Sequence, residues 1–168
     1  MMNSGEGYGF STQKPKERIT YVKEAVMSDL KLRIYEAVKD LQLINVATIT
    51  EDGKPWVRYV MGKADKDLVF RFCTRLDSRK VAQIRKNPDA HISLGVSSLE
   101  TARNWAQVQG TAEVSTDRVE LDAFWFDELN NYFSGPDDPN YCVVIVKPSS
   151  IEIGTMGSMT PEVWEPGK

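Results

Sequence analysis

Histidine and cysteine are almost missing from this sequence, which has one histidine and two cysteines among 168 residues. His91 alone does not make a zinc site, which takes three or four His, Cys or acidic ligands, so we expect an ordinary strand residue and no metal. Cys73 and Cys142 are too few for a disulfide framework and form no Cys-x-x-Cys pair. We interpret them as small buried thiols.

Long apolar runs are missing as well. No segment approaches the ~18–20 apolar residues of a membrane-spanning helix, and the amino terminus has no signal-peptide core, so we expect a cytoplasmic protein. The net charge of −3 argues against nonspecific binding to nucleic acid, which needs a basic face. Neither a Gly-x-Gly-x-x-Gly motif nor an alternating βαβ pattern is present, which argues against a Rossmann fold.

Three parts follow one another along the chain. Residues 1–27 are rich in Gly, Ser and Lys and predict a flexible leader with room for a short helix. Residues 28–155 carry the patterns of a folded domain, and residues 156–168 predict a loop-like tail. The composition, 41% hydrophobic and 27% charged, is typical of one globular domain.

The domain begins with an amphipathic helix, capped by Ser28 or Asp29. A second helical pattern covers residues 117–133, and we interpret its aromatic residues as one packed helix face. These are Trp125, Phe126, Tyr132 and Phe133. Both patterns repeat apolar residues at the spacing of a helix with one buried side.

Strand patterns account for most of the remaining domain, and Asp52-Gly53 predicts a hairpin turn between the first two. Gly110 predicts a bulge or a close approach of two strands. The predicted strands cover residues 44–50, 55–63, 68–74, 90–96, 105–114 and 141–148, with residues 151–153 extending the sheet. About six mostly antiparallel strands joined by short turns are enough to form a small barrel.

One placement of charge is unexpected. In the stretch CTRLDSRKVAQIRKNP, Asp77 has the character of a helix N-cap, yet Arg79 and Lys80 occupy the first turn. Cations at the positive end of the helix dipole cost a few tenths to about 1 kcal/mol each. Free N–H groups and two cations at a helix start make a strong anion site. The alternative is a solvated basic helix face.

Two sequence blocks resemble a known family. RYVMGK, residues 58–63, fits the pattern Arg-x-Val-x-x-Lys, and CTRLDSRK places Ser78-Arg79-Lys80 downstream of Cys73-Thr74, where the family usually has Tyr-Thr. Both blocks and their separation resemble the FMN-binding split barrels of the pyridoxamine 5'-phosphate oxidase family, especially its general stress protein 26-like branch. The resemblance covers roughly residues 30 to 150.

The resemblance implies a mainly β fold with flanking helices, a six-stranded antiparallel split β-barrel. It also implies a homodimer with an FMN in each of two clefts between the subunits. Ser78, Arg79 and Lys80 would hold the phosphate of FMN. Lys63 corresponds to the residue with which the oxidase binds the phosphate of its substrate. The residues that would line the rest of the flavin are Arg58, the backbone of Tyr59, Val60 and Met61, and Cys73 with Thr74.

Several features of the oxidase itself are missing. Its terminal Arg-x-His substrate motif has no match here, and a glutamine that meets the flavin corresponds to Trp105. Two further substrate positions correspond to Ala123 and Asp127. A Trp that follows the last strand in the stress-protein branch has a weak counterpart in Trp164. The resemblance therefore implies FMN binding but not vitamin B6 oxidation.

The sequence leaves the activity open between three hypotheses. The first is an FMN-dependent oxidoreductase with an unidentified small-molecule substrate and no recognisable catalytic acid or base. The second is a non-catalytic flavin-binding or stress-response protein. The third keeps the barrel but uses the deazaflavin F420 or haem, with His91 as the sole imidazole.

Overall fold

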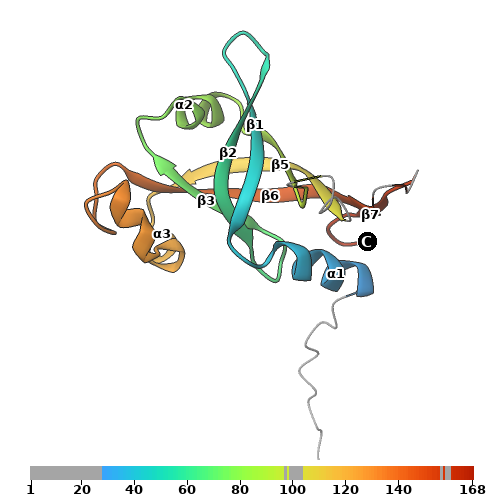
Figure 1. The fold of residues 1–168 in the computed structure, drawn as a ribbon. Coiled ribbons are helices and arrows are strands. Elements are labelled where there is room, and N and C mark those ends of the chain that lie inside the picture. Colours follow the sequence, from blue (N-terminus) through green and yellow to red (C-terminus); the bar gives the residue numbers. More distant parts are fainter. Residues whose placement is uncertain (1–27, 97, 99–103, 156, 158–159) are drawn as a thin grey trace, which may run out of the picture.

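Six antiparallel strands form a closed barrel in the computed structural model of the chain, which describes residues 28–96, 98, 104–155, 157 and 160–168. The strands are β1 (Gln42–Ile49), β2 (Pro55–Ala64), β3 (Phe70–Arg75), β4 (Asp89–Leu94), β5 (Trp105–Ser115) and β6 (Tyr141–Gly154). The hydrogen-bonded order is β3-β2-β1-β4-β5-β6, and pairing of β3 with β6 closes the ring (Figure 1). The split-barrel prediction is confirmed.

Alternating burial along the strands produces the barrel interior. On β1, Ile44, Val46 and Thr48 point inward, and on β3 Phe70 and Phe72 do the same. Burial of one face is what fixes the register of paired strands. The Asp52-Gly53 turn is also confirmed, since the Thr50 amide donates to the Lys54 carbonyl at 2.8 Å and Gly53 has a φ of 80°.

Two helices lie at opposite ends of the barrel (Figure 1). α1 (Asp29–Val38) begins at Ser28, whose side chain accepts a hydrogen bond from the Lys31 amide, so the predicted cap is confirmed. Its Ile34 and Val38 are buried in the main core. α2 (Arg79–Lys86) buries Val81 and Ile84. Each helix therefore packs its apolar side against strand residues of the main core.

The second predicted helix is broken. α3 (Arg118–Phe124) ends where Trp125 and Phe126 turn extended, and a short 3-10 helix, η1 (Asp127–Asn131), follows. Trp125, Phe126 and Phe133 pack on the outer face of β6, as their predicted burial requires. Tyr132 is 72% exposed, so its assignment to a packed face is wrong.

β6 is longer than predicted and joins most of the sheet together. It includes residues 151–153 in the same strand, and its register against β5 shifts between Gln109 and Gly110. The tail is not all loop, because β7 (Glu162–Trp164) pairs with β6. The predicted leader, residues 1–27, lies outside the described residues. No helix in the described ranges combines the length and apolar character that crossing a bilayer requires.

Candidate functional site

Positive charge gathers at the start of α2. Ser78, not the predicted Asp77, is the N-cap, and its hydroxyl does not cap the helix. The Asp77 carboxylate is drawn away by Arg75 and Asn140, which donate hydrogen bonds to it, and Arg75 in particular lowers its pKa. Arg79 follows with no acidic residue in the first turn. The first N–H groups of α2 are thus left for an anion.

Arg58 on β2 brings a further cation to the same place. Its Nη1 donates to Thr48 Oγ1 at 2.6 Å and to the Val46 carbonyl at 3.3 Å, and its Nη2 donates to Gln83 Oε1 at 2.9 Å. Burial lowers the pKa of Arg58, and the nearby charge of Arg79 acts in the same direction. A strand residue and a helix residue thus contribute to one electropositive site.

Lys80 completes the cluster from the first turn of α2. Its Nζ donates to Thr74 Oγ1 at 2.8 Å, and that hydroxyl in turn donates to Ser78 Oγ at 3.3 Å. Burial lowers the pKa of Lys80, and the charge of Arg58 adds to the shift. Thr74, which the resemblance places along the flavin, therefore lies beside the predicted phosphate ligands Ser78 and Lys80.

None of the cations Arg58, Arg79 and Lys80 forms an ion pair with a carboxylate of the described residues. Arg79 instead lies over the ring of Trp56, 5.1 Å from its centroid. Like charges held together without a counter-ion disfavour their own charged forms. The donor set is therefore suited to a dianionic phosphate, such as that of FMN, which supplies the missing negative charge.

The other predicted flavin residues are not all brought to this cluster. Tyr59 and Met61 face outward from β2 and are 70% and 40% exposed. Val60 points the other way and packs against the main core. Cys73 lies on the outer face of β3 against the aromatic cluster under α3, and burial raises the pKa of its thiol to about 11. The prediction for Tyr59, Val60 and Met61 concerns their backbone, and it stays a prediction.

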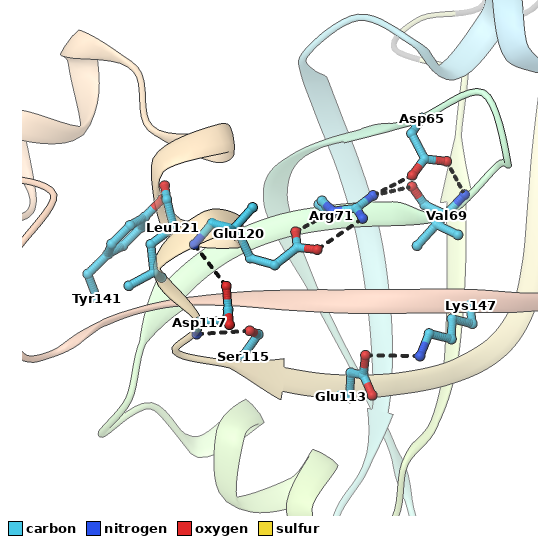
Figure 2. Close-up of polar contacts among 11 residues, drawn as sticks. Asp65, Val69, Arg71, Glu113, Ser115, Asp117, Glu120, Leu121, Tyr141 and Lys147 are labelled. Carbon is cyan, nitrogen blue, oxygen red and sulfur yellow. Dashed lines mark hydrogen bonds and ion pairs between the residues drawn. The ribbon is translucent and has the colours of Figure 1, made fainter.

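Lys63 lies on the opposite face of β2 from Arg58, because the two residues are five positions apart and an odd offset along a strand changes the face. Its Nζ is 5.6 Å from the centroid of the Phe124 ring. It lines a cavity of about 400 Å³ together with Arg71 and Glu120. Arg71 donates to Glu120 and to Asp65, both at 2.7 Å (Figure 2). Lys63 is therefore separate from the cation cluster within one chain.

A larger cavity, of about 640 Å³, lies where α1, β5 and the end of β6 meet. Trp105 lines it and packs on Gly154, where a Cβ would overlap the indole. At the rim, Arg33 donates two hydrogen bonds to Glu162, at 2.9 and 2.5 Å. Trp105 thus lies at this cavity, whereas Trp56 lies at the cation cluster.

Sequence reasoning missed the partners that hold the cations. Thr48 and Gln83 accept hydrogen bonds from Arg58, and the ring of Trp56 lies under the guanidinium of Arg79. Trp56 lies two residues before Arg58 on the same strand, so the two side chains are on one face of β2. This spacing could have predicted that Trp56 lies near the cation cluster. Gln83 carried no such signal, because a glutamine in mid-helix is ordinary.

Comparisons with known proteins identify the family of the chain. Residues 30–153 match the sequence profile described as Pyridoxamine 5'-phosphate oxidase. General stress protein 26 of Bacillus subtilis (strain 168) is 28% identical over 133 residues, which cover 79% of this chain and 94% of the relative. Pyridoxine/pyridoxamine 5'-phosphate oxidase of Sphingopyxis alaskensis is 28% identical over 125 residues, 69% of this chain and 56% of the relative.

The fold agrees too. The crystal structure of General Stress Protein 26 from Bacillus anthracis str. Sterne matches with a TM-score of 0.71 at 25% identity, covering 81% of this chain and 98% of that one. The resemblance inferred from the two sequence blocks is confirmed. Since the profile spans most of the chain, this protein belongs to the pyridoxamine 5'-phosphate oxidase family.

Proposed function

We propose that this protein binds FMN, with the phosphate at the start of α2, and acts as an FMN-dependent oxidoreductase. The observation that carries the proposal is the cluster of Arg58, Arg79 and Lys80, which has hydroxyl, amide and aromatic partners but no carboxylate among the described residues. Family membership supports the same ligand. The cytoplasmic location expected from the sequence stays a prediction.

When bound, the isoalloxazine of FMN supplies the hydride and electron chemistry. The chain's own contribution at the phosphate is binding and orientation, through the Ser78 hydroxyl, the first amides of α2 and the cations. Its thiols are not suited to act as nucleophiles, because burial raises the pKa of both Cys73 and Cys142 to about 11 and keeps them protonated at neutral pH. His91 is exposed on β4, away from the barrel interior.

The proposed assembly is a homodimer with FMN between the subunits. Support comes from the outer face of the β1–β2 hairpin, where large apolar side chains are exposed side by side. Leu43 pairs across the strands with Met61, and Val57 and Tyr59 follow along β2. A contiguous apolar patch of this kind is typical of an interaction surface.

Leu43→Arg tests the dimer. Placing a cation on this face should raise the dimer dissociation constant by about 100-fold or more, because two-fold symmetry sets the new charge in both copies of one interface. Sedimentation velocity measures the dissociation constant. Tyr132→Arg, which places a cation on another exposed large side chain outside the hairpin, is the control that should remain dimeric. A wild-type monomer that binds FMN tightly would contradict the shared cleft.

Redox function is tested by mixing the FMN-loaded protein with NADH and NADPH without oxygen. Bleaching of the visible flavin bands is expected if a nicotinamide delivers electrons to the bound flavin. Bands that persist with both donors would favour the non-catalytic flavin-binding hypothesis. The same spectra of the purified protein distinguish the ligand, since a Soret band would identify haem and a deazaflavin spectrum F420.

A further inference from the structure

Gln83 occupies the junction between the two parts of the cation cluster. Its Oε1 accepts one hydrogen bond from Arg58 Nη2 at 2.9 Å and another from Thr48 Oγ1 at 2.6 Å. The Thr48 hydroxyl also accepts from Arg58 Nη1 at 2.6 Å. The three side chains thus form a closed triangle that links α2 to β1 and β2.

The triangle fixes where Arg58 stands relative to the helix. Gln83 lies four residues after Arg79 and three after Lys80, so all three share one face of α2. Thr48 is fully buried, which leaves its hydroxyl no alternative partner in water. Arg58 is therefore held beside Arg79 and Lys80 by hydrogen bonds to a buried hydroxyl and a half-buried amide.

The partners of Arg58 are all uncharged. It donates to a hydroxyl, a carboxamide and the Val46 carbonyl. A carboxylate at position 83 would orient the guanidinium as well but would neutralise it. An amide orients the cation and leaves its charge for a ligand.

We propose, on the basis of the FMN function proposed above, that Gln83 is a positioning residue for the phosphate, holding Arg58 in place while leaving its positive charge uncompensated. Gln83 acts through Arg58 and does not itself contact the ligand. Its neutral side chain is the property that matters, beyond its contribution to packing.

Gln83→Glu and Gln83→Leu separate these two contributions. Each variant is titrated with FMN and with riboflavin, which has the same ring but no phosphate, and its thermal unfolding is measured without flavin. Asn131→Asp, on η1, is the control for an amide-to-carboxylate change elsewhere on the surface.

Gln83→Glu should weaken FMN binding roughly 10- to 100-fold, the equivalent of one charge-assisted contact, and change riboflavin binding by no more than about twofold. Its flavin-free melting temperature should equal or exceed that of wild type, because the new carboxylate pairs with the cations. Gln83→Leu should melt lower, since Thr48 and Arg58 lose an acceptor, but weaken FMN less than Gln83→Glu does. Asn131→Asp should leave both affinities unchanged.

FMN affinity of Gln83→Glu within about twofold of wild type would overturn the role of Gln83 while leaving the proposed function intact. A Gln83→Leu variant that loses more FMN affinity than Gln83→Glu would overturn the claim that the neutral side chain is what matters, because that order indicates that orienting Arg58 is the whole contribution of Gln83. Wild-type protein that binds neither flavin would overturn the proposed function and this inference with it.

Discussion

Replacing Ser78 and Arg79 together with alanine is expected to raise the dissociation constant for FMN by roughly 10²- to 10⁴-fold. Each residue offers the phosphate a charge-assisted hydrogen bond, and such bonds contribute about 1.5–3 kcal/mol apiece. Flavin fluorescence titration of the flavin-free protein measures the change. Riboflavin, which lacks the phosphate, should bind the variant and the wild type alike.

Stability should not follow affinity in this variant. Burial is the main cause that lowers the pKa of Arg58 and of Lys80, and the charge of Arg79 lowers both further, so its removal relieves repulsion in the flavin-free protein. The lost contact between Arg79 and Trp56 offsets this by about 0.5–1 kcal/mol, the range for an exposed cation–π pair. We therefore expect the flavin-free unfolding free energy to stay within about 1 kcal/mol of wild type.

Arg85→Ala is the matched control, because it removes the same charge from the exposed far end of α2. It should leave FMN affinity nearly unchanged. Full FMN affinity in the Ser78→Ala, Arg79→Ala variant would contradict the proposed position of the phosphate at the start of α2. Equal losses in both proteins would show that the overall charge of the helix, rather than the geometry at its start, governs binding.

The barrel was predictable because its strands obey a local rule. Alternating apolar residues and a turn such as Asp52-Gly53 determine which strands pair as hairpins. The break after Phe124 was not predictable in the same way, because residues 117–133 contain no glycine or proline and keep a helical spacing. At the break, the ring of Trp125 packs 5.2 Å from that of Tyr141, centroid to centroid, at the start of β6, and the local helical spacing carries no information about this contact.

The candidate site was likewise only partly predictable from the sequence. Ser78, Arg79 and Lys80 were predictable because cations at a helix start violate a local electrostatic preference, and such violations indicate a ligand. Gln83 and Thr48 were not, since their role depends on which strand lies beneath α2. The resemblance placed Cys73 and Thr74 together along the flavin, but adjacent residues on a strand face opposite sides, and only Thr74 lies with the cations.

The β5–β6 pair of the barrel provides the test with the largest expected effect on stability. Gly110 on β5 stands where the register against β6 shifts, and a Cβ built there would overlap the Lys147 carbonyl oxygen. The Lys147 carbonyl carbon and Pro148 Cα would also be 3.0 Å away. All of these atoms are backbone, so no side-chain rotation relieves the contact.

Gly110→Ala should therefore lower the unfolding free energy by about 3 kcal/mol or more, near the upper end for overpacking, and the melting temperature by roughly 6–12 °C. Because β6 pairs with both β3 and β5, displacing it strains the closure of the whole ring. Gly53→Ala is the comparison, since a Cβ there meets no atom within 4 Å and only the φ of 80° opposes it. Backbone conformation alone costs about 1–2 kcal/mol. If Gly110→Ala loses no more stability than Gly53→Ala, the two strands separate easily at this point, and glycine is not required there for close approach.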